Sequence, residues 1–149
     1  MHPDDREIVA MVHTQQREAA FSLLVKKYQQ RLYWHLRKMV IVHEDADDLL
    51  QNCFIKVWQN LDKFRGDSSL YTWIYRIATN EALNFLNKRR AELLASPDDL
   101  EIVFSGHIDS DPLYSGDEIE KRLQKSILSL PDKQRLVFNM KYFDNLKYE

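Results

Sequence analysis

The chain has 149 residues, of which 44% are hydrophobic and 30% charged, a balance that suits one packed domain or two small ones. Its three Gly and four Pro are too few for the tight turns of an all-β fold, and its single Cys excludes an internal disulfide. No apolar run reaches the roughly 18 residues of a membrane span. The first residues lack the basic and apolar segments of a signal peptide, so we expect a cytoplasmic protein.

The net charge of −2 hides an uneven distribution along the chain. Residues 91–120 carry acidic side chains and no Lys or Arg, whereas residues 1–90 and 121–149 each carry a net positive charge. The near-neutral total therefore does not exclude a nucleic-acid partner.

Apolar residues recur at helical spacing through most of residues 1–90. A short stripe at 8–12 precedes long stripes at 21–39, 46–61 and about 70–90, each with the spacing of an amphipathic helix. The pattern predicts an all-α helical bundle over residues 1–90.

The remaining residues divide into two parts. Residues 91–116 are acidic, contain Pro and Gly, and show no sustained periodicity, which predicts a flexible linker. Helical spacing returns in residues 117–149. Because that segment is shorter than the roughly 40 residues usually needed for independent folding, we expect it to be an incomplete second helical domain.

Four carboxylates open the helix expected after residue 43: Glu44, Asp45, Asp47 and Asp48. One interpretation is a solvated face whose charges suit the positive end of the helix dipole. The other is a surface for a basic partner, held by charge-assisted hydrogen bonds. No His or Cys stands at ligand spacing beside them, and neither a phosphate-binding Gly loop nor a nucleophile–base pair is visible. We therefore expect no metal, no cofactor and no enzyme activity.

The stretch from 70 to 80 predicts a helix with two different faces. One side gathers Leu70, Trp73, Ile74, Ile77 and Ala78, which indicates core. The other gathers Tyr71, Tyr75, Arg76, Thr79 and Asn80. The two tyrosine rings either pack on a neighbouring helix with their hydroxyls in water, or form a platform for unpaired bases, where stacking is worth about 1–3 kcal/mol per base.

Basic and amide side chains on both sides of this stretch favour the nucleic-acid interpretation. Candidate phosphate contacts are Lys63, Arg65, Lys88, Arg89 and Arg90. Candidate contacts to base edges or backbone are Asn80, Asn84 and Asn87.

Two segments resemble bacterial RNA polymerase sigma factors of the extracytoplasmic-function group of the sigma-70 family. The segment DADDLLQNCFIKVWQNLDKFRGDSSLYTWIYRIATNEALNFLNKRR is similar to region 2, and LSLPDKQRLVFNMKYFDNLKYE is similar to the start of region 4. The order of acidic helix, F-R-G-D-S loop, T-W-I-Y-R-I-A-x-N helix, linker and L-P-x-x-x-R-x-V-F is much more specific than any one motif.

The resemblance implies a subunit that binds core RNA polymerase and directs promoter recognition and opening without catalysing a reaction. It implies that the acidic helix docks on the clamp of the largest catalytic subunit through Asp45, Asp48, Gln51 and Asn52, although the family more often has Glu in place of Asn52. It implies that opened minus-ten DNA is captured by Phe64, Arg65, Gly66, Asp67, Ser68, Ser69, Tyr71, Tyr75, Arg76 and Asn80. Trp73 and Ile77 are then assigned to packing, and an anti-sigma factor is a further expected partner.

The same resemblance places region 2 at residues 1–90, the linker at 91–116 and the beginning of region 4 at 117–149. The sequence stops before the helix-turn-helix, so we expect most recognition of the minus-thirty-five element to be lacking. Two alternatives stay open at this point: a helical protein-interaction module, and a DNA-binding regulator that does not act through polymerase.

Overall fold

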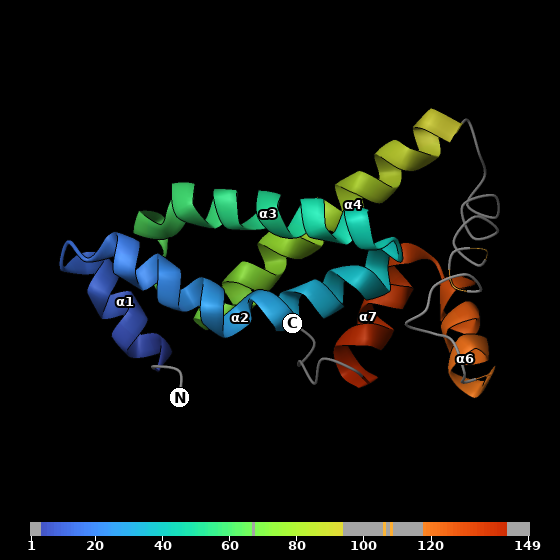
Figure 1. Cartoon of the computed structure of the whole chain (residues 1–149), viewed down its shortest axis with the longest axis horizontal. Coiled ribbons are helices and arrows are strands. Elements are labelled where there is room, and N and C mark those ends of the chain that lie inside the picture. The colour runs from blue at the N-terminus through green and yellow to red at the C-terminus, as the bar shows by residue number, and fades with distance from the viewer. Residues whose placement is uncertain (1–3, 67, 94–105, 107, 109–117, 143–149) are drawn as a thin grey trace.

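The computed structural model describes residues 4–66, 68–93, 106, 108 and 118–142, and this part of the chain is helical and contains no strand. In chain order its elements are α1 (Asp5–His13), α2 (Arg17–Val40), α3 (His43–Asn60), the short 3₁₀ helix η1 (Leu61–Lys63), α4 (Leu70–Leu93), α6 (Glu118–Leu128) and α7 (Asp132–Tyr142) (Figure 1). The prediction of an all-α fold is confirmed. The expected linker lies almost entirely outside the described residues, as does Asp67.

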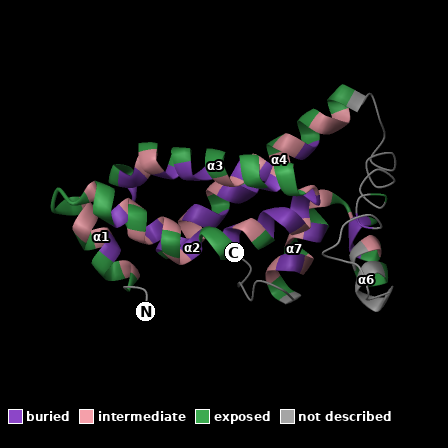
Figure 2. Ribbon diagram, in the orientation of Figure 1, coloured by how far each residue is buried: buried purple, intermediate pink, exposed green. Residues whose placement is uncertain are grey.

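Helices α1 to α4 form a bundle in which α2 packs against each of the other three (Figure 1). Figure 2 shows buried positions along the inner sides of these helices. The core residues of α2 follow the predicted spacing, with Leu24, Leu32, Leu36 and Met39 fully buried. Burying one such side chain contributes about 1.5–3 kcal/mol, so the long α2 stripe is the main support of the bundle.

The turn between α2 and α3 is unusually tight. Ile41 closes it with a φ of 69° while its side chain is fully buried. A β-branched residue rarely adopts this left-handed conformation, so burial of Ile41 in the core compensates for local backbone strain. The turn brings the acidic start of α3 next to the end of α2.

The buried face of α4 differs from the one that the sequence predicts. Tyr71 and Tyr75 are only 5% and 4% exposed and belong to the core, whereas Arg76 and Asn80 lie on the outside. The reason is that α4 packs against both α2 and α3, so its buried arc is wider than a single stripe. The prediction that both tyrosines face outward is wrong.

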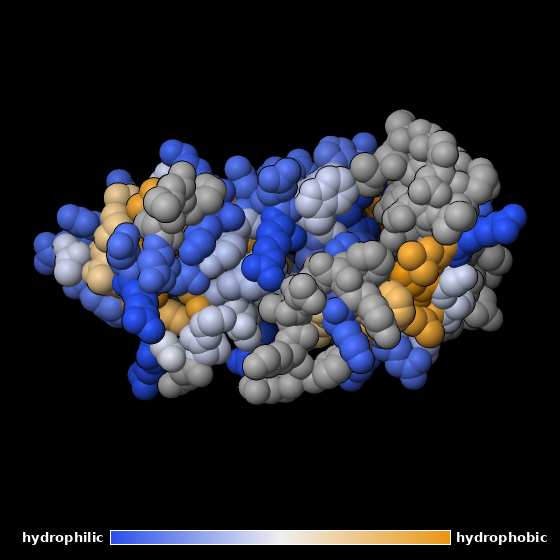
Figure 3. All heavy atoms as spheres, turned by 90° about the horizontal axis from the view of Figure 1, so that it is seen from below, coloured by the Kyte–Doolittle hydropathy of each residue, from blue (hydrophilic) through white to orange (hydrophobic). Residues whose placement is uncertain are grey.

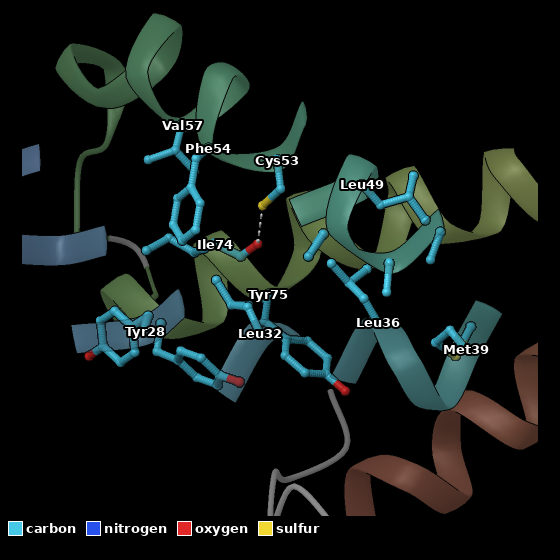
Figure 4. Packing of buried hydrophobic residues seen from close by; sticks show 14 of the residues in the cluster. Tyr28, Leu32, Leu36, Met39, Leu49, Cys53, Phe54, Val57, Ile74 and Tyr75 are labelled. Carbon is cyan, nitrogen blue, oxygen red and sulfur yellow. Dashed lines mark hydrogen bonds between the residues drawn. The ribbon is translucent and has the colours of Figure 1, made fainter. Parts of the chain in front are cut away.

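Of the five α4 residues predicted to face the core, three are buried and two are only partly buried. Leu70, Ile74 and Ala78 are buried as expected, and the Cys53 thiol on α3 lies 3.9 Å from the Ile74 carbonyl oxygen (Figure 4). Trp73 and Ile77 are only partly buried at the edge of the core. The ring of Trp73 packs on Phe64, with 5.2 Å between centroids.

Helices α6 and α7 follow the four-helix bundle in the chain. Helix α7 packs against α2, and Figure 1 shows it beside the C-terminal end of that helix. Leu136 and Met140 of α7 are partly buried against the same core as α1 to α4, and Leu128 of α6 belongs to that core. In the part of the chain that the structure describes, no helix has both the length and the apolar character needed to cross a membrane.

Candidate functional site

The outer face of α3 carries an exposed polar stripe. Asp48, Gln51 and Asn52 are all exposed and stand three and four residues apart, so they lie side by side on one face of the helix. Asp45 lies one turn before them, is partly buried, and pairs with Arg89 of α4 at 3.7 Å. The structure therefore brings the four predicted polymerase-binding residues to one surface and ties one of them to α4.

A groove beside this stripe was not foreseen from the sequence. It has a volume of about 610 Å³ and lies between α2 and α3, with apolar walls and with Asp47, Gln51 and Gln59 at its rim. Its apolar lining comprises Phe21, Val25, Leu50, Phe54, Ile55 and Trp58. Ile55 is 54% exposed, and this large apolar residue on an otherwise polar face was the one signal in the sequence.

In the loop between η1 and α4, one apolar side chain is buried and the side chains around it are exposed. Phe64 is buried, whereas Lys63, Arg65 and Gly66 are exposed. Gly66 has a φ of 81° with open space around its Cα, so the backbone conformation rather than crowding favours glycine there. Ser69 caps α4 because its hydroxyl accepts the Thr72 backbone N–H at 3.1 Å. Ser69 is therefore the N-cap of α4.

A second hollow lies between this loop and α1. It encloses about 750 Å³, with Phe64, Gly66, Ser68 and Ser69 on one side. Its other side comes from the start of α1 and the residue before it, including Asp5 and Arg6. The loop is a predicted DNA-binding segment, and no pattern in the sequence indicates that α1 forms the opposite wall of the hollow.

The two buried tyrosines of α4 are held by aromatic contacts with α2. The ring of Tyr71 lies 4.9 Å from that of Tyr28, and the Arg31 guanidinium covers its face at 3.9 Å. Tyr75 stacks on His35, whose Nε2 is 2.9 Å from the Thr79 hydroxyl. In this arrangement a base cannot reach either ring without displacing part of α2.

A carboxylate from α1 joins this cluster. The Tyr28 hydroxyl donates to Asp5, with both carboxylate oxygens 2.6 Å away, and Lys27 pairs with the same group at 2.7 Å. Burial, and then the hydrogen bond to Asp5, raise the pKa of Tyr28 well above its usual value. The hydroxyl is thus a permanent donor that ties α1 to α2.

The exposed edge of α4 is a continuous polar stripe that ends in basic residues. Exposed side chains recur at Arg76, Asn80, Asn84, Asn87 and Lys88. Arg89 and Arg90 are partly buried, and both are ion-paired, Arg89 to Asp45 and Arg90 to Asp132 at 2.5 Å. Of the predicted phosphate contacts, Lys63, Arg65 and Lys88 are exposed, whereas these two arginines are engaged within the protein.

Other chemistry is not visible among the described residues. No group of His, Cys, Asp or Glu in residues 4–66, 68–93 and 118–142 could hold a metal ion. Cys53 is buried, and burial raises the pKa of its thiol to about 12, so the sulfur is protonated and unreactive at neutral pH.

The fold and the surfaces together define an all-α helical protein with an exposed acidic face on α3 and a separate polar-basic edge on α4. A family model, Sigma-70 region 2, matches residues 24–92. The chain is 34% identical to the RNA polymerase sigma-H factor of Pseudomonas aeruginosa over 97% of this chain and 79% of that protein. It is 32% identical to the ECF RNA polymerase sigma-E factors of Escherichia coli K12 and Salmonella typhimurium LT2, over 89% of this chain and 73% of each of them.

These matches are sufficient to assign the family. The chain belongs to the extracytoplasmic-function group of the sigma-70 family of RNA polymerase sigma factors. It is thus a transcription initiation factor, not an enzyme, and its general partners are core RNA polymerase and promoter DNA. The two alternatives left open by the sequence are not favoured.

Proposed function

We propose that the outer face of α3 docks on the clamp of the largest polymerase subunit while the edge of α4 and its preceding loop capture the opened minus-ten element. The single observation that supports this best is that Asp48 and Asn52 on α3 and Arg76 and Asn80 on α4 are exposed on elements packed together in one bundle. A partner bound at the first pair would therefore hold the second pair at a fixed place on the DNA.

The docking part rests on charge and exposure. Asp48, Gln51 and Asn52 offer acceptors and an amide on a helix face that packs against nothing else in the described chain. Carboxylates on such a face pair well with Arg side chains, which form charge-assisted bonds of good geometry. The groove between α2 and α3 adds an apolar area beside them, where a partner side chain can be buried.

The proposed DNA-binding surface includes fewer residues than the sequence suggested. Exposed Lys63, Arg65, Arg76 and Lys88 supply positive charge, and Asn80 supplies an amide for base edges. The hollow beside Phe64, Gly66 and the serines has room for an unpaired base. Tyr71 and Tyr75 support this surface from inside the core.

Three further assignments belong to the same proposal. Helices α6 and α7 correspond to the beginning of region 4, and residues 1–90 to region 2. The protein acts in the cytoplasm, where polymerase and DNA are found. An anti-sigma factor regulates it by covering the α3 face and the edge of α4.

The docking proposal is tested by binding of bacterial core RNA polymerase to the wild-type chain and to Asp48→Arg. We expect Asp48→Arg to lose binding, because it places a positive charge where the partner is expected to be basic. The control is Glu18→Arg, which makes the same charge reversal at an exposed site in the first turn of α2. Equal binding by both variants would contradict the docking surface, and no binding by the folded wild-type chain would contradict the function itself.

A further inference from the structure

Helix α7 is attached to the bundle by a buried arginine. Arg135 is 3% exposed, and its Nη2 donates to the Met39 carbonyl oxygen at 2.8 Å. Met39 lies in the last turn of α2, where carbonyl groups lack a partner within the helix and the helix dipole is negative. A guanidinium is therefore well suited to this position, and α7 supplies it.

The same junction contains two more charged groups. The Asp132 carboxylate lies 3.6 Å from Arg135 and 2.5 Å from Arg90 of α4, and its side chain is only 12% exposed. Burial lowers the pKa of Arg135, and Asp132 opposes that effect. Two arginines from different helices thus depend on one carboxylate, and a buried charge that loses its partner is strongly destabilising.

The apolar contact around this junction is incomplete. Leu136 and Met140 of α7 are partly buried against the core, and Asn139 is fully buried. Leu123 of α6 and Val137 of α7 remain 40% and 43% exposed, and Figure 3 shows hydrophobic surface at the end of the molecule that carries these helices. Docking of α7 therefore combines these apolar contacts with the charged groups of Asp132 and Arg135.

We propose that the C-terminal end of α2 and Arg90 of α4 form a docking site for α7, and that α7 occupies it in competition with nucleic acid. The competition rests on the DNA-binding part of the proposed function and extends it to Arg90, which stands two residues after the exposed Lys88 and is paired with Asp132 while α7 is docked. Within the described residues, Arg90 donates to the Asn87 side chain at 3.3 Å and forms its ion pair with the Asp132 carboxylate. A phosphate that binds Arg90 must replace this carboxylate, so docking of α7 and binding of DNA weaken each other by the same factor.

Docking is tested by hydrogen exchange in the chain with Asp132→Asn. This variant keeps the shape of the side chain but leaves Arg90 and Arg135 without their carboxylate. Helix α7 has 11 residues, too short to be stable in water alone, so its amides should lose their protection when it undocks. Glu18→Gln is the control, since it removes one exposed carboxylate at the opposite end of α2 and should leave α7 protected.

Protection of α2 and α4 in the same measurement shows whether the bundle is intact. If Asp132→Asn unfolds the bundle, Arg135→Gln serves as the second variant, because it removes the hydrogen bond to Met39 and should also release α7. Amides of α7 that exchange as slowly in these variants as in Glu18→Gln would overturn the docking site.

Competition is tested by the salt dependence of binding to a fluorescent single-stranded DNA oligonucleotide. One additional phosphate contact steepens the slope of log K against log salt by about 0.7 for single strands. We expect that increase in Asp132→Asn relative to Glu18→Gln, and we expect Arg90→Gln in the Asp132→Asn background to remove it. Equal slopes in all three, or no binding in any, would overturn the competition, whereas the polymerase-binding experiment above tests the proposed function separately.

Discussion

The ring of Tyr75 stacks on the imidazole of His35, with 4.0 Å between centroids and 25° between planes. This contact joins α4 to α2 at a position where neither ring is exposed. Together with Tyr28, Tyr71 and Thr79, the pair forms a polar-aromatic layer inside the bundle. Tyr71 and Tyr75 thus hold the exposed edge of α4 in place from within the core.

Tyr75→Ala should therefore destabilise the protein, by about 3–5 kcal/mol, as expected when a large buried aromatic side chain is removed. Urea-induced unfolding measures this loss. The adjacent Arg76→Ala is the matched control, since Arg76 is exposed and a surface substitution typically changes the free energy of unfolding by less than about 0.5 kcal/mol. Similar midpoints for the two variants would contradict the buried position of Tyr75.

The raised pKa of Tyr28 gives stability a dependence on alkaline pH. The native state keeps the hydroxyl protonated above the usual tyrosine pKa of about 10, whereas the unfolded state ionises near that pH. The stabilising contribution is fully present below about pH 10 and is lost as pH rises toward the native pKa, at up to about 1.4 kcal/mol per pH unit.

The comparison of wild type with Tyr28→Phe isolates this effect. Between pH 8 and pH 11 the wild type should lose more free energy of unfolding than Tyr28→Phe, because the two proteins differ only in the Tyr28 hydroxyl. Parallel curves for the two proteins would show that Tyr28 is not held protonated by burial and Asp5.

Ser69→Ala should remove the N-cap of α4 and destabilise the protein by about 1 kcal/mol. The Ser69 hydroxyl accepts the Thr72 N–H, whereas the Ser68 hydroxyl only contacts the Ser69 carbonyl at 3.3 Å. Thermal unfolding of Ser69→Ala beside Ser68→Ala measures the difference. A larger loss in Ser68→Ala would place the cap one residue earlier.

Ile55→Asp should weaken binding of core polymerase about tenfold or more. Burial of this side chain in an interface would contribute about 1.5–3 kcal/mol, and about 1.4 kcal/mol corresponds to a factor of ten. Leu123→Asp is the control, since Leu123 is also a large exposed apolar residue but lies on α6. Unchanged affinity in Ile55→Asp would restrict the docking surface to the polar stripe.

The sequence was sufficient to predict the helical fold but not the width of each buried face. The spacing of Leu24, Leu32 and Leu36 identifies one stripe of α2, and the structure confirms it. For α4, helical periodicity gives the direction of the stripe, but contact with two other helices adds Tyr71 and Tyr75 to it. The neighbouring helices determine the width of the buried face, and the local spacing of apolar residues does not reveal those neighbours.

In the candidate surfaces too, local spacing predicts some features, whereas others depend on tertiary contacts. Exposure of Asp48, Gln51 and Asn52 follows from the polar face of one amphipathic helix, so the sequence could indicate it. The groove beside Ile55 depends on how α2 and α3 cross, and the burial of Arg135 depends on a contact 96 residues away in the chain. In the sequence, Arg135 is indistinguishable from a solvated charge.

Arg76→Ala and Asn80→Ala should impair promoter opening while core polymerase still binds. Both side chains are exposed on α4, away from the α3 stripe, so their loss should remove the proposed contacts to DNA without unfolding the bundle. Permanganate footprinting of unpaired thymines measures opening, and Lys26→Ala on α2 controls for the loss of one exposed polar side chain elsewhere. We expect weak footprints for the α4 variants and a normal footprint for Lys26→Ala. Normal footprints for both α4 variants would mean that the opened strand is held at another surface, of which the hollow between α1 and the Phe64 loop is the next candidate.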